Sequence, residues 1–175
     1  MVSAYSCYLC TLMNTVYLLL GSNEGDRVHW LIRSEVQIGI SCGIIKAASS
    51  LYETAAWGVE DQPDFLNKAI CIETVLDPFA LLKILNDIEA AFGRQRHTRW
   101  GQRTLDIDIL LYNSEVVDTP TLKIPHPAIT QRRFTLEPLA EIAPNLVHPL
   151  HHKTITELLA ICPDPLPVKK MKIVH

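Results

Sequence analysis

Two aspartates lie two residues apart in an apolar segment, directly after a run of arginines. Residues 99–112 read RWGQRTLDIDILLY, and side chains alternate faces along a strand, so Asp106 and Asp108 project together. Two carboxylates roughly 7 Å apart on a half-buried strand repel each other, and hard divalent cations relieve that repulsion. The pair therefore predicts a site for metal ions, and we expect Mg²⁺ with substrate phosphates among its remaining ligands.

The basic residues before this strand fit the same chemistry. Guanidinium groups bind phosphate oxygens in a bidentate manner, and glycines at 93 and 101 indicate a loop. The arginines concerned are Arg94, Arg96, Arg99 and Arg103. The alternative is a half-exposed strand whose aspartates face water beside a solvated basic loop. An aspartate pair in mid-strand is locally unfavourable, however, and such violations mark functional sites.

Length and composition limit the class of protein. The 175 residues fit one domain, 1–175, with a core at about 14–162. A formal charge of −3 argues against a general nucleic-acid binder. The sequence contains no uninterrupted run of about 18 apolar residues, so we expect no membrane-spanning helix. We expect residues 1–12 to be an extension outside the core, with Met13 as the functional start.

The five cysteines are odd in number and scattered, which argues against a disulfide framework. They favour a reduced, cytoplasmic compartment. No surface stripe predicts an interface between copies of the chain, so we expect a monomer.

Hydrophobic periodicity and turn residues predict alternating strands and helices. We expect strands at 16–20, 65–75 and 105–112, an extended segment at 44–54, a hairpin at 113–117, and helices at 25–40, 78–92, 132–142 and 154–161. The predicted inward-facing stripe of the first helix contains Val28, Leu31, Ile32, Val36 and Ile40. That of the second contains Phe79, Leu82, Leu85, Ile88 and Phe92.

Two successive strand–helix–strand units indicate an α+β sandwich of the ferredoxin-like kind. A doubly wound α/β sheet is the alternative. Neither the dinucleotide fingerprint GxGxxG nor the phosphate-loop pattern GxxxxGK[ST] occurs, so a nucleotide must be held in another way.

Residues 99–109, RWGQRTLDIDI, resemble the signature of the 6-hydroxymethyl-7,8-dihydropterin pyrophosphokinase family. Further blocks resemble this family in the same order, over about residues 14–160. They are LGSN at 20–23, SSLYET at 49–54, DQPDFLN at 61–67, IE at 88–89, GRQR at 93–96, PHP at 125–127 and RRF at 132–134.

The resemblance implies an α+β fold that is a ferredoxin-like α/β/α sandwich with a mainly antiparallel central sheet. It also implies transfer of diphosphate from ATP to 6-hydroxymethyl-7,8-dihydropterin in folate biosynthesis, with two Mg²⁺ ions and AMP as the second product. It implies that Asp106 and Asp108 hold both metals, and that Arg94 and Arg96 are catalytic. The implied ATP-binding residues are Glu89, Arg94, Arg96, Trp100, Arg103, Ile109, His126 and Arg132.

For the pterin, the resemblance implies contacts from Thr54, Asn67, Trp100 and Phe134, and from the loop residue Trp57. A flat polar heterocycle needs aromatic faces and an amide to read its edge. Phe65 and Phe134 would supply the faces, and Asn67 both a donor and an acceptor.

Two other classes of function fit parts of the pattern. An RNA-binding module of ferredoxin-like fold would need paired aromatic residues on the exposed sheet face. A metal-dependent phosphohydrolase or nuclease usually supplies more acidic or histidine ligands than two aspartates on one strand. Formation of AMP, as opposed to ADP or inorganic phosphate, separates the transferase from the hydrolase.

Overall fold

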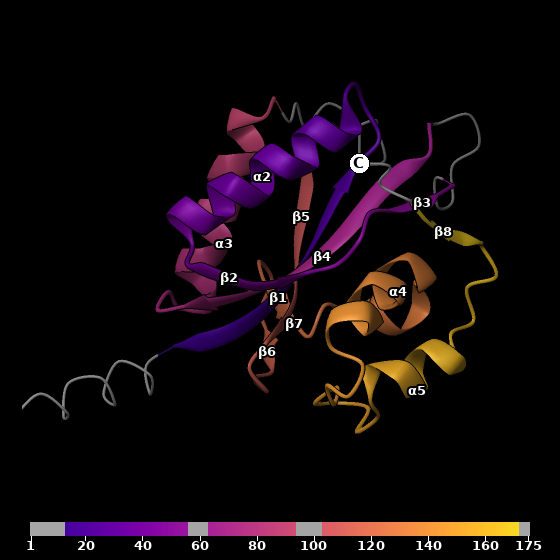
Figure 1. Ribbon diagram of the computed structural model, residues 1–175. Coiled ribbons are helices and arrows are strands. Elements are labelled where there is room, and N and C mark those ends of the chain that lie inside the picture. The colour runs from indigo at the N-terminus through magenta and orange to yellow at the C-terminus, as the bar shows by residue number, and fades with distance from the viewer. Residues whose placement is uncertain (1–12, 56–62, 94–102, 172–175) are drawn as a thin grey trace, which may run out of the picture.

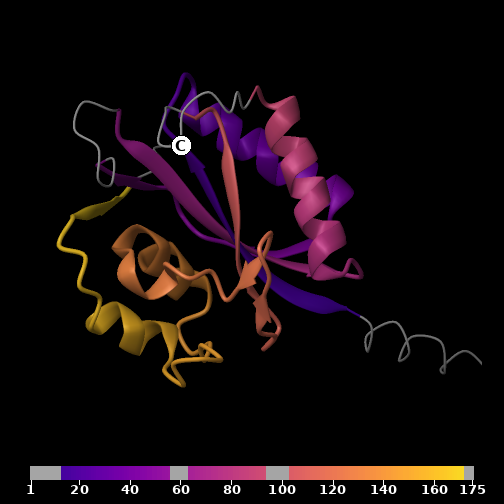
Figure 2. The same ribbon diagram turned by 180° about the vertical axis from the view of Figure 1, so that it is seen from behind.

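The fold is a central sheet covered by helices on both faces (Figure 1). It is taken from a computed structural model, which describes residues 13–55, 63–93 and 103–171. The helices α2 (Arg27–Ser41) and α3 (Pro78–Ala91) cover one face. The helices α4 (Arg133–Ile142) and α5 (Ile155–Ala160) cover the other, as the view from behind also shows (Figure 2).

Six strands form the sheet, in the order β5-β1-β4-β3-β8, with β2 pairing with β4 as well. They are β1 (Asn14–Ser22), β2 (Ile44–Ala48), β3 (Tyr52–Thr54), β4 (Phe65–Thr74), β5 (Asp106–Tyr112) and β8 (Val168–Lys170). Each of these pairings is antiparallel. The predicted α/β/α sandwich with an antiparallel sheet is confirmed.

Each face of the sheet has its own apolar core, because strand side chains alternate. Leu18, Leu20, Ile107 and Ile109 pack on the side of α2 and α3. Leu19, Leu110 and Leu111 pack on the side of α4 and α5. The pairing of β1 with β5 shifts register between Tyr17 and Leu18, so Leu111 packs in the second core and not beside Ile107 and Ile109.

Helix α3 begins and ends where its sequence indicates. Asp77 caps it by accepting hydrogen bonds from the backbone N–H groups of Phe79 and Ala80, Pro78 is its first residue, and Gly93 follows it with a φ of +85°. Its buried face differs from the predicted stripe. Leu81 is fully buried, whereas the side chain of Phe79 is half exposed, because tertiary packing rotates the helix toward Leu81.

The predicted inward face of α2 is wrong at four of its five residues. The buried residues of α2 are Leu31, Ser34 and Ile38. The exposed ones include Val28, Ile32, Val36 and Ile40. The small hydroxyl of Ser34 bonds to the carbonyl of Leu31, so a polar residue is satisfied on the buried side.

Three strand predictions also need correction. The segment 44–54 forms two strands, β2 and β3, which pair with different halves of β4. The predicted hairpin at 113–117 does not form, because β6 (Val117–Asp118) pairs with β7 (Lys123–Ile124). Strand β8 has no counterpart among the predicted elements, since three residues on a sheet edge leave almost no periodic signal.

Gly43, which follows α2, predicts a large loss of stability on substitution. Its φ is +149°, and an added Cβ would lie 2.2 Å from the carbonyl oxygen of Glu73. We expect Gly43→Ala to lower the free energy of unfolding by about 3 kcal/mol. Gly93→Ala is the matched control, because its φ is also positive but no atom lies within 4 Å of the added Cβ. It should cost about 1 kcal/mol, and equal losses in urea denaturation would contradict the argument.

Candidate functional site

Asp106 and Asp108 lie on the same face of β5, on the side of α4 and α5. Asp106 pairs with Gly21 across the sheet and Asp108 pairs with Leu19, whose side chain belongs to the core beneath α4 and α5. Their side chains are 24% and 34% exposed. The predicted alignment of the two carboxylates on one face of a strand is confirmed, and both remain accessible.

Arg103 contacts the first of these carboxylates. Its guanidinium donates to Oδ2 of Asp106 at 2.6 Å. The backbone of Arg103 is held by Asn23, whose Oδ1 accepts from the Arg103 N–H at 2.8 Å and whose own N–H donates to the Arg103 carbonyl at 3.1 Å. Asn23 thus shapes the turn after β1 and does not cap α2, because Asp26 accepts the hydrogen bond at that helix start.

Glu89 of α3 is almost fully buried beneath β5. Its Oε1 accepts a hydrogen bond of 2.7 Å from the backbone N–H of Ile107, the residue between the two aspartates. A buried carboxylate needs such a donor, because burial without one is costly. The contact fixes β5 against α3 at the site, so Glu89 supports the aspartates from behind.

The electrostatics of the pair are those expected for crowded carboxylates. Burial and then the negative charge of Asp106 raise the pKa of Asp108 to about 7, and Glu89 adds to the rise. The guanidinium groups of Arg132 and Arg103 act in the opposite direction. The arrangement therefore favours a bound proton or a bound cation at Asp108.

His126 approaches Asp108 as a neutral ring. Burial and then the charge of Arg132 lower the pKa of His126 to about 4. Its Nδ1 accepts from the backbone N–H of Ala128 at 3.2 Å, so the ring proton is assigned to Nε2, which lies 4.0 Å from Oδ1 of Asp108. His126 can thus donate a hydrogen bond into the site at neutral pH.

A pocket of about 290 Å³ opens beside Asp108 and His126. Its apolar side includes Ile109 and Leu82, and its rim includes Lys123 from β7. The pocket combines an apolar wall with a few polar groups, which is the usual composition of a small-molecule site. The structure therefore places Ile109 at a cavity that adjoins Asp108.

A second group of predicted residues lies across the sheet from the aspartates. Tyr52 of β3, Asn67 of β4, Gly21 of β1 and Asp106 of β5 are paired in one row, so they share a face. Nδ2 of Asn67 donates to Oγ1 of Thr54 at 3.0 Å, and both side chains are buried. The hydrogen bond fixes the orientation of the Asn67 amide.

Gly21 lies in the middle of this row, where an added side chain would crowd its neighbours. A Cβ there would lie 3.3 Å from Oδ1 of Asn67 and 3.9 Å from the ring of Phe65. Glycine inside a strand often marks a close approach by a ligand. A flat molecule lying over Gly21 would reach the Asn67 amide on one side and the carboxylates on the other.

Helix α4 brings Arg132 and Phe134 toward this face. The guanidinium carbon of Arg132 lies 5.6 Å from the centroid of the Phe134 ring. The helix has no cap from its own N-terminal side chain, and the buried Asp164 instead accepts from the backbone N–H of Arg133 at 3.0 Å. A residue 31 positions downstream therefore holds the start of the helix.

Five predicted site residues lie outside the described residues: Arg94, Arg96, Arg99, Trp100 and Trp57. The structure brings together all the others, in two groups. Asp106, Asp108, Arg103, His126, Ile109, Glu89 and Arg132 gather around β5, and Thr54, Asn67, Phe65 and Phe134 lie on β3, β4 and α4. Sequence reasoning missed Gly21 and Asp164 as contributors, although Gly21 lies within the matched LGSN block.

Within residues 13–55, 63–93 and 103–171, no cluster of three or more His, Cys, Asp or Glu side chains has the arrangement of a metal site. Over the same described ranges, no helix is both long enough and apolar enough to cross a membrane.

Comparison with known proteins gives consistent matches. Residues 17–144 match the family described as 7,8-dihydro-6-hydroxymethylpterin-pyrophosphokinase (HPPK). The chain is 43% identical over 145 residues to the 2-amino-4-hydroxy-6-hydroxymethyldihydropteridine pyrophosphokinase of Aquifex aeolicus, covering 83% of this chain and 90% of the relative. It is 46% identical over 130 residues to the enzyme of the same name from Bacillus subtilis, covering 74% and 78%.

Solved structures share the fold. The chain superposes on the Plasmodium falciparum HPPK-DHPS structure with a TM-score of 0.69 and 17% identity, over 85% of this chain and 44% of that one. The match of 128 consecutive residues to the family and the identities above 40% carry the assignment beyond fold. The chain belongs to the HPPK family, the ATP-dependent diphosphotransferases of folate biosynthesis that act on 6-hydroxymethyl-7,8-dihydropterin.

Proposed function

We propose that this chain transfers diphosphate through a metal site at Asp106 and Asp108, between a nucleotide held beside β5 and a pterin held over Gly21. The hydroxymethyl oxygen of the pterin bonds to the β-phosphorus of ATP, the bond from that phosphorus to the α,β-bridging oxygen breaks, AMP leaves and the hydroxyl proton is released. The observation that carries the proposal is the row that joins Asn67, Gly21 and Asp106 on one face of the sheet.

The two carboxylates fit two Mg²⁺ ions. Both are hard oxygen donors on one face. Burial and then the Asp106 charge raise the pKa of Asp108, and a bound cation would relieve both effects. When bound, the ions would neutralise phosphate charge and hold the attacking and leaving oxygens in line. Two aspartates supply few ligands, so substrate phosphates and water would complete each coordination shell.

The remaining nucleotide contacts are assigned by position and charge. Arg103 and Arg132 supply guanidinium groups on either side of the aspartates, and neutral His126 donates from Nε2. Ile109 would line the adenine side of the pocket, with Glu89 behind it. We propose Arg94, Arg96 and Trp100 as further contacts on the strength of the family pattern alone.

The pterin contacts follow from the second group of residues. The amide of Asn67, oriented by Thr54, would read donors and acceptors on the heterocycle edge. Phe65 and Phe134 would cover its faces, with Trp57 and Trp100 added by the family pattern. No side chain is assigned as general base, because positioning and charge neutralisation carry most of phosphoryl transfer.

The protein is proposed to act as a cytoplasmic monomer without nucleic-acid partners. Supporting observations are the formal charge of −3 and the free thiols of Cys42, Cys71 and Cys162, which suit a reducing compartment. Size-exclusion chromatography with light scattering tests the oligomeric state.

The direct test is chromatographic analysis of purified protein with ATP, Mg²⁺ and 6-hydroxymethyl-7,8-dihydropterin. AMP should form only when the pterin is present, in equal amount to the pterin diphosphate, and EDTA should abolish it. ATP cleavage at the same rate without pterin would support a hydrolase instead and would contradict the proposal.

Metal binding should depend on pH through Asp108. Its raised pKa means that it is protonated below about pH 7, and a metal ion must displace that proton. We expect the affinity for Mg²⁺ to fall about tenfold per pH unit below about pH 7 and to level off above it. His126, with its pKa of about 4, stays neutral over this range. Calorimetric titration of nucleotide-free protein from pH 5.5 to 8 measures the slope, and a flat profile would contradict the assignment.

A further inference from the structure

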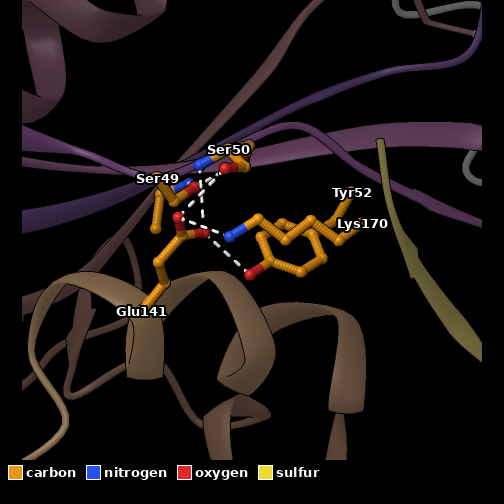
Figure 3. A network of polar contacts seen from close by, with 6 residues as sticks. Ser49, Ser50, Tyr52, Glu141 and Lys170 are labelled. Atoms are coloured by element: carbon orange, nitrogen blue, oxygen red, sulfur yellow. Dashed lines mark hydrogen bonds and ion pairs between the residues drawn. The ribbon is translucent and has the colours of Figure 1, made fainter. Parts of the chain in front are cut away.

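Glu141, in the last turn of α4, accepts hydrogen bonds from four donors (Figure 3). Oε2 accepts from the backbone N–H of Ser50 at 3.0 Å and from the Tyr52 hydroxyl at 2.7 Å. Oε1 accepts from the Ser50 hydroxyl at 2.9 Å and from Nζ of Lys170 at 2.9 Å. Each carboxylate oxygen thus has two partners, which is a fully used acceptor set.

This arrangement stabilises the ionised carboxylate. Burial by itself raises the pKa of Glu141, but the hydrogen bonds from Lys170, Tyr52 and Ser50 outweigh it and lower the pKa to about 2. Burial and the Glu141 carboxylate raise the pKa of Tyr52 in turn, so its hydroxyl keeps its proton. The network is charged and complete at any physiological pH.

The four donors all belong to one edge region of the sheet. Ser50 directly precedes β3, Tyr52 is the first residue of β3, and Lys170 lies on β8, which pairs with β3. The preceding residue, Ser49, is itself tied to β4 by hydrogen bonds in both directions with the backbone of Ala69. The carboxylate therefore joins the end of α4 to the strand pair β3 and β4.

That strand pair carries the residues assigned to the pterin edge. Tyr52 points toward α4, because its hydroxyl meets Glu141, and Thr54 projects to the same face two residues later. Asn67 is the cross-strand partner of Tyr52 and shares this face. The stacking residue Phe134 is in the first turn of α4, at the opposite end of the helix from Glu141.

We propose that Glu141 is a positioning residue for the pterin site, which sets the separation between Phe134 on α4 and the Thr54–Asn67 pair on the sheet. The proposal rests on the pterin contacts given under the proposed function. Glu141 touches no substrate in this arrangement. It acts by fixing a helix against strands, where a displacement of about 1 Å is enough to cost a large part of the binding or rate.

Only a carboxylate of this length satisfies all four donors. Glutamine keeps one acceptor oxygen but turns an –NH₂ group toward donors, and it loses the charge that pairs with Lys170. Alanine removes every contact and leaves the Ser50 and Tyr52 donors to water. The predicted order of damage is therefore Glu141→Ala, then Glu141→Gln, then Tyr52→Phe, which removes one hydrogen bond and keeps the ring.

The test is the dissociation constant of 6-hydroxymethyl-7,8-dihydropterin, measured by calorimetry with saturating Mg²⁺ and a non-hydrolysable ATP analogue. We expect an increase of about tenfold for Glu141→Gln and about threefold for Tyr52→Phe. Affinity for the ATP analogue should change less than about twofold, because most of its proposed contacts lie on β5 and its flanks and not on α4. Glu137→Gln, one turn earlier on α4 and paired with Arg133, is the matched control and should leave both constants unchanged.

The pterin affinity, the nucleotide affinity and the melting temperature of the variants together test the positioning role of Glu141. A fall in melting temperature with unchanged pterin affinity would make Glu141 merely structural and would overturn the proposal. Equal weakening of pterin binding and nucleotide binding would also overturn the proposal, because it would indicate a general loosening of the fold. Asn67→Ala separates the proposal from the proposed function. If Asn67→Ala binds the pterin as tightly as the parent protein, the pterin site is misplaced and the proposed function fails. If Asn67→Ala binds the pterin weakly but the Glu141 and Tyr52 variants bind it normally, only the positioning role of Glu141 fails. Should Glu141→Ala not fold, the Glu141→Gln and Tyr52→Phe variants still decide between these outcomes.

Discussion

The Asp108→Asn variant should lose on the order of 10⁴-fold in diphosphotransfer rate while keeping its fold. Asparagine preserves the shape of the side chain but removes the negative charge that would hold Mg²⁺ opposite the phosphates. The loss should appear in kcat at saturating ATP, pterin and Mg²⁺, because charge neutralisation matters most in the transition state. Rapid-quench measurement of AMP formation gives this number.

The same variant should be more stable than the parent protein at alkaline pH. The folded-state pKa of Asp108 is raised to about 7, above its ordinary value of about 4, so the stability penalty grows as the pH rises from about 4 to about 7 and stays constant above that. With screening at a side chain that is 34% exposed, we expect a gain of about 1 kcal/mol at pH 8 and none at pH 4. Activity and stability would then move in opposite directions, as is usual for strained functional groups.

Asp87→Asn is the control for both measurements. Asp87 lies on α3, is 68% exposed and pairs only weakly with Lys83 at 3.3 Å. Its substitution should change neither rate nor stability appreciably. An Asp108→Asn enzyme with a rate within tenfold of the parent would show that the carboxylate pair is not the metal site.

Arg132→Ala should lower the rate by about 10³-fold, the usual effect of removing an arginine that stabilises phosphoryl transfer. Arg132 lies at the start of α4, its charge lowers the pKa of both Asp108 and His126, and its guanidinium lies over Phe134. Its loss would leave the phosphates with less positive charge beside them. It would also remove the guanidinium plane that packs on the Phe134 ring. Arg132→Lys keeps the charge without the planar fork, so we expect an intermediate loss. Steady-state kinetics with varied ATP and varied pterin measure both effects.

The neighbouring Arg133 provides the comparison. Its side chain pairs with Glu137 at 3.4 Å and donates to the Asp164 carbonyl at 3.2 Å. These contacts hold Arg133 to its own helix and to the C-terminal segment, whereas the charge of Arg132 acts on Asp108. Arg133→Ala should leave the rate within about twofold of the parent. Similar losses for the two arginine variants would mean that α4 was disturbed as a whole, and the assignment of Arg132 to phosphate would then fail.

Local sequence rules predicted the elements whose signals are contained within a few residues. Asp77 and Pro78 begin α3, and Gly93 follows its end, because caps act over a single turn. The alternation of side chains along β5 puts Asp106 and Asp108 on one face whichever strand pairs with β5. These features depend on backbone geometry and not on distant contacts.

The buried faces of the helices were less predictable. Val36 and Ile40 have the spacing of an inward stripe on α2, yet both are exposed and Ser34 is buried. Apolar spacing shows that a helix is amphipathic, but where two stripes overlap only packing against the sheet decides which one is covered. The same reason accounts for Leu81 replacing Phe79 on α3.

By itself, the sequence determined the order of the longer strands and the four helices, the common face of the two aspartates and, through its ordered motifs, membership of the HPPK family. Only the tertiary structure decided that Asn67 and Asp106 lie on either side of Gly21 in one row, that Asp164 caps α4, and that Glu141 joins this helix to β3. The difference is physical. Helix caps and strand alternation arise within one turn or two residues, whereas these contacts join segments between 31 and 91 residues apart, and register and packing form them only when the chain is folded.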